Sequence, residues 1–562
     1  MLSTLHWQDH AVILLYLTCM LALGGYLALR QFRATNKQID NEYFLAGRRM
    51  PWFAVGMSVI ASLLSSLTYL SEPGEVWNSG ITHIFGKMLA IPFEVVIVWL
   101  FCIPFMMRFR FTSAYEYLEH RFGPTARLLG VVLFIAMVVL WMGFVVLASS
   151  RALSTVTGLH LFVVIATVGV VATIYTMIGG LRAVIWTDVV QVVLLIGGGL
   201  FTIGYVATTT GTFLPDWYGA AVEHLNQQDN THAVPFFSVN PLVRATVVTV
   251  AINMCVWHVC THTANQMTVQ RYYSTSNMRS ARRSFLTGTI FGVGLNMMLV
   301  VVGLALLFFY FGQDIPLDQN LNPGEKQDRD LIFPTFAVNR LPAGLGGGIL
   351  AALLAAAMSS IDSGINSIAT VVTQELQRWK KSSTPAGKTS NAERRRRVIT
   401  AMIITLLAGA FITYAASLLS LLPKDFGIVD AMPRTFNAIT GPLGGLFLIG
   451  MFVRWARERV AVVATMLGLL TSIVIGYFGQ IVGQLLHWGF MSQSTLSSYG
   501  LMDVNGNIRS LSFTWVMPAA IGVTLLSAAI MGSFDRSKQR DLAGLTWYTR
   551  HEKSPLTEQT EP

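Results

Sequence analysis

The chain has 562 residues, of which 53% are hydrophobic and 12% are charged, and its mean hydropathy is +0.55. These values exclude an ordinary soluble globular domain and indicate a polytopic membrane protein. The net charge of +10 does not call for nucleic acid, because basic residues beside apolar segments set topology and contact anionic membrane lipid. We interpret the basic run at 393–397 in this way and expect no nucleic-acid partner.

The first apolar segment, residues 11–29, is long enough to cross a hydrocarbon core of about 30 Å. It follows Asp9 and no basic residue, so we interpret it as a span and not as a signal peptide. Hydropathy along the chain predicts about thirteen transmembrane helices in all. The further spans are expected at 51–79, 81–108, 127–155, 160–179, 183–207, 244–267, 284–312, 345–374, 398–422, 427–453, 459–488 and 513–533.

The distribution of basic residues predicts the orientation. Arg30, Arg48 and Arg49 follow the first span, whereas the expected outer loop 208–243 has no Lys or Arg. The positive-inside rule therefore places the N-terminus outside. We expect an integral protein of the cell (inner) membrane whose polar residues 535–562 form a loosely ordered cytoplasmic tail.

The stretch "AAAMSSIDSGINS", residues 355–367, lies inside a predicted span yet carries hydroxyls and a carboxylate. Ser359, Asp362, Ser363 and Asn366 stand at i, i+3, i+4 and i+7 and so share one helical face. Oxygen atoms of this kind are the ligands that hard cations prefer. Helix packing through small residues is the alternative, but it leaves Asp362 unexplained, since an ionisable group at this depth costs about 2.5–3.5 kcal/mol.

Two other segments point to the same chemistry. Asp188 begins a long apolar run, where a capping or interfacial role is the alternative. Residues 56–77 follow a helical pattern that Ser65, Ser66 and Thr68, and then Pro73–Gly74, interrupt. Interrupted helices expose backbone carbonyls that can bind Na⁺ near the midplane. The sequence therefore predicts an ion site between the second and ninth spans.

A third polar segment is "CVWHVCTHTANQ", in which Cys255, His258 and His262 share one face. No acidic residue adjoins them in sequence, so we favour a pocket lining over a metal site. The chain has no HExxH and no GxxxxGK[ST] motif, and no catalytic constellation indicates an enzyme.

Six motifs in chain order resemble the sodium:solute symporter family, particularly its sodium/iodide, multivitamin and monocarboxylate cotransporter branch. They are "NEYFLAGRRMPWFAVGMSVIAS" (41–62), "TSAYEYLEHRFG" (112–123), "YTMIGGLRAVIWTDVVQ" (175–191), "NQMTVQRYYS" (265–274), "MSSIDSGINSIATVVTQEL" (358–376) and "TGPLGGLFLIGMF" (440–452).

The resemblance implies a leucine-transporter-type fold of two five-helix inverted repeats, with broken first and sixth core helices. The expected parts are an extra N-terminal helix and inner loop (1–50), the first repeat (51–207), an outer loop (208–243), the second repeat (244–453), two C-terminal helices (454–534) and the tail (535–562).

The resemblance also implies two ion sites, each described here by matching motifs. The conserved Na⁺ site would comprise carbonyls of Ala61, Leu64 and Ala356 with the hydroxyls of Ser359 and Ser360. A second site, for Na⁺ or H⁺, would comprise Asp188, Ser359, Asp362 and Ser363. Asp362 departs from the small or hydroxyl residue usual in the family. One or two Na⁺ ions would therefore couple to transport.

By resemblance, the solute would bind beside these ions. The expected contacts are Ser65, Thr68, Phe85, Lys87, Trp141, His258 and His262. Trp141 stands where sialic-acid carriers have an arginine. Lys87 and the histidines could attract a carboxylate, so we expect a Na⁺ symporter for a monocarboxylate or other small organic anion. The alternatives are a Na⁺/sugar symporter, an H⁺-coupled carrier, an ion channel and a transporter-like sensor; oligomeric state is not predicted.

Overall fold

The computed structural model describes residues 5–32, 39–109, 111–227, 236–318, 321–381, 391–421, 428–502, 506, 508–535 and 541–552. Within these ranges the chain forms helices and no β-strand, which confirms the all-α prediction. The helices are α1 (Trp7–Phe32), α2 (Ile39–Leu45), α3 (Trp52–Leu63), α4 (Ser66–Ser79), α5 (Thr82–Ile97), α6 (Ile103–Met106), α7 (Glu116–Arg121), α8 (Pro124–Thr157), α9 (Leu161–Thr210), α10 (Leu214–Gln227), α11 (Val247–Ala264), α12 (Gln266–Tyr273), α13 (Met278–Leu307), α14 (Lys326–Asn339), α15 (Leu345–Lys381), α16 (Asn391–Leu419), α17 (Ile428–Phe452), α18 (Glu458–Gly476), α19 (Phe478–His487), α20 (Gln493–Ser498) and α21 (Val516–Phe534).

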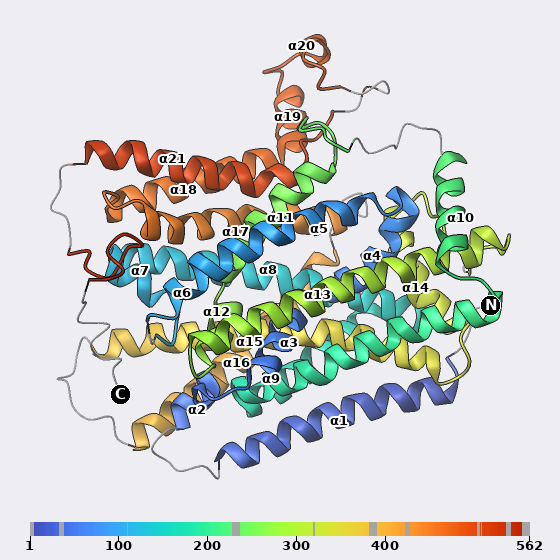
Figure 1. Ribbon diagram of the computed structural model, residues 1–562, viewed down its shortest axis with the longest axis horizontal. Coiled ribbons are helices and arrows are strands. Elements are labelled where there is room, and N and C mark those ends of the chain that lie inside the picture. Colours follow the sequence, from blue (N-terminus) through green and yellow to red (C-terminus); the bar gives the residue numbers. More distant parts are fainter. Residues whose placement is uncertain are drawn as a thin grey trace.

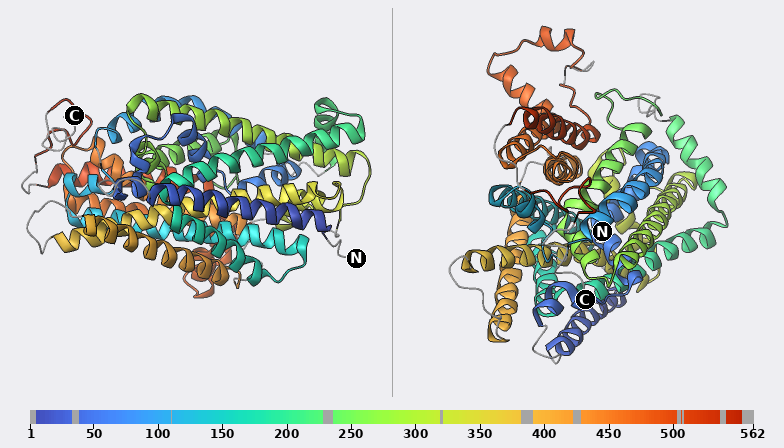
Figure 2. Two further views of the ribbon diagram at one scale, coloured as in Figure 1. Left: turned by 90° about the horizontal axis from the view of Figure 1, so that it is seen from below. Right: turned by 60° about the vertical axis from the view of Figure 1, so that its left-hand side comes forward.

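The long helices lie nearly parallel in one bundle (Figures 1 and 2). At its centre is α15, whose most apolar 18-residue window is 94% buried. It packs against α1, α3, α8, α9 and α16. The polar face predicted for residues 355–367 therefore faces other helices and not lipid.

The span prediction agrees with the helices in most places. In the described residues, 11 helices are long and apolar enough to cross a membrane, or 12 when the bent pair α3 and α4 counts as one span. The 50-residue α9 contains a non-helical residue, Gly180 (φ 57°, ψ −168°), between the two spans predicted at 160–179 and 183–207. A side chain there would meet Tyr43, since an added Cβ would lie 2.9 Å from its carbonyl oxygen.

The predicted broken helix is present, and the break lies between α3 and α4, which meet at 66°. Leu64 (φ −89°, ψ 92°) and Ser65 (φ −84°, ψ 171°) are extended there. The second interruption expected at Pro73–Gly74 is wrong, because α4 continues through both residues. Gly74 instead permits a close approach, since an added Cβ would lie 3.0 Å from the carbonyl oxygen of Arg329.

The span predicted at 244–267 is also interrupted. Asn265 (φ −83°, ψ 114°) separates α11 from α12, and its side-chain oxygen accepts a hydrogen bond of 3.0 Å from the backbone of Met267. This bond satisfies one of the donors that a helix start leaves free. As a result, α12 begins as a separate short helix, all of whose residues are buried.

Two expectations outside the core need correction, and a third gains detail. The span predicted at 459–488 ends at Gly476, after which α19 leaves the bundle (Figure 1). The prediction was too long because α19 is also apolar, and hydropathy alone does not separate it from the span. The expected outer loop 208–243 contains α10. Of the tail predicted to be loose, residues 541–552 pack against the helical bundle: Trp547 donates from its backbone to the carbonyl of Met451 in α17 at 2.9 Å. Residues 536–540 and 553–562 of that tail lie outside the described ranges.

Both ends of α15 are bonded to other helices. Asp9 of α1, which the sequence suggested only as a topology signal, is buried and accepts from the backbone N–H groups of Gly344 (2.9 Å) and Gly347 (2.7 Å) at the start of α15. Near the other end, Glu375 accepts from Arg127 of α8 at 2.5 Å. The helix predicted to bind ions is therefore fixed at both ends.

Candidate ion and solute sites

The break after α3 brings backbone carbonyls to the hydroxyls of α15. The Ser359 hydroxyl donates to the Ala61 carbonyl at 2.9 Å and to that of Ala356 at 3.2 Å. The Ser360 hydroxyl lies 3.3 Å from the carbonyl of Ser62 and 3.4 Å from that of Ala356. The last carbonyls of a helix have no partner within it, so the break makes them available to another ligand. Four of the five residues predicted for the conserved Na⁺ site meet here.

The fifth predicted residue, Leu64, lies in the break itself and is buried. The whole set consists of uncharged oxygen donors, which suits Na⁺ better than a soft transition metal. No group of three His, Cys, Asp or Glu side chains that could hold a metal occurs in the described residues. The donor chemistry thus fits a hard monovalent cation.

The second predicted site contains a residue that the sequence did not suggest. The fully buried guanidinium of Arg271, on α12, donates to Asp188 (3.0 Å), Ser363 (2.5 Å), Ser58 (2.7 Å) and the carbonyl of Met267 (2.7 Å). The sequence suggested Arg271 only as a basic residue of an inner loop. Asp188 is consequently ion-paired inside the protein, and the suggestion that it merely caps or lies at the interface is wrong.

Asp362 lies beside this ion pair and has different partners. Its carboxylate accepts from the hydroxyl of Tyr175 at 2.6 Å and from that of Ser363 at 3.3 Å. The other oxygen of Asp188, Oδ1, is buried without a hydrogen-bond partner among the described residues. When both acids are ionised, two carboxylates face one guanidinium, which leaves one negative charge in excess.

A cavity of about 300 Å³ adjoins the break between α3 and α4. Helices α3, α4, α5, α8, α11, α13 and α17 surround it. Six of the seven residues predicted to contact solute line it: Ser65, Thr68, Lys87, Trp141, His258 and His262. Phe85 does not, because it is 45% exposed and packs on Phe236 with ring centroids 6.0 Å apart. Positions 85 and 87 point to different sides of one helix.

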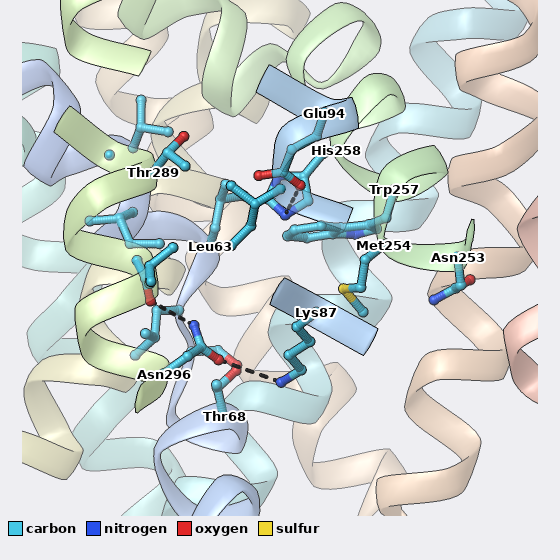
Figure 3. A pocket seen from close by; sticks show the side chains of 18 of the residues that line it. Leu63, Thr68, Lys87, Glu94, Asn253, Met254, Trp257, His258, Thr289 and Asn296 are labelled. Atoms are coloured by element: carbon cyan, nitrogen blue, oxygen red, sulfur yellow. Dashed lines mark hydrogen bonds and ion pairs between the residues drawn. The ribbon is translucent and has the colours of Figure 1, made fainter. Parts of the chain in front are cut away.

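One end of the cavity holds Lys87, and its side chain does not extend outward to solvent. It forms an ion pair with Glu72 and lies 3.4 Å from the side-chain oxygen of Asn296 (Figure 3). Glu72 also contacts His83 at 3.1 Å. The ammonium therefore remains in the cavity wall and is already paired with one carboxylate.

The other end holds Glu94, which sequence reasoning missed. Its carboxylate lies 3.2 Å from the Nε2 atom of His258 and is 3% exposed (Figure 3). The sequence argument against a metal site at His258 assumed that no acidic residue lies nearby, and Glu94 shows that this assumption is wrong. The described residues still offer no third ligand for a metal. A glutamate inside a predicted span is the signal that could have identified it.

The family assignment follows from comparison of the whole chain. A sequence model of the sodium:solute symporter family matches residues 43–468. The chain belongs to this family. It is therefore an integral membrane protein that couples solute transport to Na⁺, and it is not an enzyme.

Similar proteins in the family are named for several different substrates. The sodium/sialic acid symporter of Proteus mirabilis (strain HI4320) is 30% identical over 473 residues, which cover 84% of this chain and 89% of that protein. Human sodium-coupled monocarboxylate transporter 1 is 32% identical over 480 residues, covering 84% and 74%. Multivitamin and iodide cotransporters also match. The expected similarity to that branch is confirmed, and sialic acid symporters are comparably similar.

A solved structure agrees with these matches. The substrate-bound, outward-open state of a Na⁺-coupled sialic acid symporter aligns with a TM-score of 0.75 and 27% identity, covering 96% of this chain and all of that one. The two proteins thus share one helical bundle over nearly the whole length of the present chain.

Proposed function

We propose that this symporter imports a small organic acid together with Na⁺ by alternating access. The observation that carries the proposal is the meeting of the broken α3–α4 pair with the hydroxyls of α15, directly beside a polar cavity. Shared residues between an ion site and a solute cavity supply a physical route for coupling, because each ligand then favours the same arrangement of helices.

The proposed conserved Na⁺ site comprises Ala61, Leu64, Ala356, Ser359 and Ser360. Ser359 and Ser360 hold the ion by hydroxyls, and the other three hold it by backbone carbonyls. Support comes from the short contacts among four of these residues. Leu64 also lines the cavity, so bound solute lies next to an ion ligand.

The cluster of Asp188, Ser359, Asp362 and Ser363 is proposed as a second cation site. Arg271 already supplies one fixed positive charge to it. The excess negative charge and the unpartnered Asp188 oxygen support binding of one further monovalent cation, Na⁺ or H⁺.

The number of ions determines how far the solute can be concentrated. Each Na⁺ entering through about 100 mV releases about 2.3 kcal/mol, and a tenfold gradient adds about 1.4 kcal/mol. One ion therefore supports an accumulation of several hundredfold, and two ions about 10⁵-fold for a neutral solute.

The membrane arrangement is part of the proposal. We take α9 as two spans that meet near Gly180, and α3 with α4 as one, which gives thirteen. The N-terminus would lie outside and the C-terminus in the cytoplasm, in the cell membrane. Residues 51–207 and 244–453 would be the inverted repeats, consistent with interruptions in the first helix of each.

Hydrogen-bond donors at the lysine end of the cavity support the choice of an acid. Lys87, Asn296 and Thr68 offer hydrogen-bond donors there. Relatives named for sialic acid and for monocarboxylates both carry acids. A neutral sugar is the second candidate, because Asn253, Asn437 and Trp141 line the cavity with buried polar atoms that have no partner among the described residues.

The test is charge movement across proteoliposomes that contain the protein, with pooled monocarboxylates, sugars, vitamins and inorganic anions added with and without Na⁺. We expect a transient inward current that requires both Na⁺ and an acid pool. Current with sugars only would favour the second candidate, and current under a proton gradient alone would shift coupling to H⁺. Steady current without added solute would indicate a channel, and binding without flux a sensor.

A further inference from the structure

The cavity has two charged ends that belong to one helix. Lys87 and Glu94 stand at i and i+7 of α5 and both line the cavity. That spacing puts them on one face, about 10 Å apart along the axis. Met88 and Ile91 lie between them in the cavity wall, so the ends are separated by apolar surface. Figure 3 shows both side chains reaching into the cavity at different levels.

The Glu94 end accepts hydrogen bonds and has free capacity. In the described residues its only ion-pair contact is the Nε2 atom of His258, at 3.2 Å. The Nδ1 atom of the same histidine is buried without a partner. Trp257 contributes an indole whose ring centroid lies 4.8 Å from that of His258. A carboxylate beside an indole recognises a positively charged nitrogen.

The Lys87 end donates hydrogen bonds. An ammonium has three N–H donors, and Glu72 and Asn296 account for two of them. The third can reach an oxygen acceptor on a solute. Because Glu72 already balances its charge, this end recognises an acceptor by hydrogen bonding, with little net attraction for an anion.

The charges of the cavity wall favour a ligand that carries a cation in addition to its acid group. Lys87 and Glu72 cancel, so an ionised Glu94 beside a neutral His258 is the remaining charge on the cavity wall. A monocarboxylate would add a second negative charge at low dielectric constant. A zwitterion adds none and supplies the cation that Glu94 lacks.

We infer that the solute is an amino-carboxylate whose two charged groups lie at opposite ends. Its carboxylate binds Lys87 and Asn296, its ammonium group binds Glu94 and Trp257, and its apolar middle lies along Met88 and Ile91. This inference rests on the proposed symport function and deepens it.

The experiment compares three series of equal chain length by the amount of each solute that proteoliposomes take up in a Na⁺-dependent manner: ω-amino carboxylates with two to eight methylenes, the matching monocarboxylates and the matching alkylamines. For the wild type we expect an optimum at intermediate length and at least a tenfold preference for the amino-carboxylate over its matching monocarboxylate. Glu94→Gln should reduce that preference at least tenfold. Glu223→Gln, on the exposed face of α10, is the matched control and should leave it unchanged.

The possible outcomes separate the two proposals. If monocarboxylates are preferred at every length, or if only sugars produce Na⁺-dependent current, the inference is overturned while symport stands. An unchanged preference in a folded Glu94→Gln protein also overturns it. Absence of both Na⁺-dependent current and Na⁺-dependent uptake with every pool and series overturns symport as well. The wild-type series decides the question even where the variant does not accumulate.

Discussion

Asp188 and Glu94 are both carboxylates inside the bundle, and they differ in how completely they are paired. Asp188 is fully buried and receives Arg271 and the hydroxyl of Ser58. Glu94 is almost as buried but has a single imidazole contact and faces a cavity. The two carboxylates are buried to a similar degree, and they differ in the number of internal partners.

The difference has an energetic reason. A guanidinium that makes four hydrogen bonds fixes the helices that contribute them, here α3, α9, α12 and α15. Breaking such a cluster leaves buried charge without a partner, which is costly. At Glu94, by contrast, an arriving ligand can add a bond without displacing one.

The largest effect is expected from Arg271→Met, which would leave Asp188 without its counter-charge. We expect a loss of about 3–5 kcal/mol in the free energy of unfolding, measured as a lower midpoint of thermal unfolding in detergent. Asp188→Asn combined with Arg271→Met should recover most of this loss. If the double variant were no more stable than Arg271→Met alone, the unpaired charge of Asp188 would not be the cause of the lost stability.

The next effect concerns sodium. Ser360→Ala should raise the Na⁺ concentration for half-maximal uptake about tenfold, the equivalent of about 1.4 kcal/mol. Asp188→Asn should also raise it, by less, because Arg271 already occupies part of that site. The control is Ser149→Ala, whose hydroxyl, within the described part of the chain, bonds to carbonyls of its own helix and to no other group. Unchanged sodium dependence in both site variants would contradict the ion-site assignment.

A third carboxylate, Asp9, is paired with backbone and not with a cation. Asp9→Ala would remove the hydrogen bonds to the first turn of α15 and should lower stability by about 1 kcal/mol, read from the unfolding midpoint. Sodium dependence should change little. His10→Ala, at a neighbouring exposed position, serves as control. Equal midpoints for the two variants would show that Asp9 contributes nothing to α15.

The smallest effect is expected at Tyr69, whose buried hydroxyl has no partner in the described residues and does not line the cavity. Tyr69→Phe removes an unsatisfied group and should be neutral or stabilising by less than about 1 kcal/mol. Uptake should be unchanged. Impaired transport would indicate that an unpartnered hydroxyl outside the cavity takes part in function.

Sequence reasoning identified most spans and the broken helix because both depend on local composition. Hydropathy gives a span directly, and clustered Ser and Thr mark the break at Leu64–Ser65. It failed at α19, where an apolar helix turns away from the bundle, and at Pro73, which α4 accommodates.

The partners of the buried charges could not be predicted in the same way. Arg271 and Asp188 lie 83 residues apart, and they meet only because α12 starts anew after Asn265 and packs under α3. Glu94 and His258 lie on different helices whose relative rotation no local pattern specifies. Hydropathy locates a charge in the membrane, but only the packing of helices shows what it faces.

The attachment of α15 at both ends determines which part of the ion site can move. Asp9 bonds to its first turn and Arg127 pairs with Glu375 near its last turn, so Ser359 and Ser360 lie on a helix that is bonded to its neighbours near both ends. Helix α3, in contrast, ends at an extended junction, and the ion ligand proposed on it is a backbone carbonyl. A small tilt of α3 about Leu64–Ser65 would lengthen several ion contacts together. For the proposed sodium site, we therefore expect release of the ion to involve movement of α3 and not of α15.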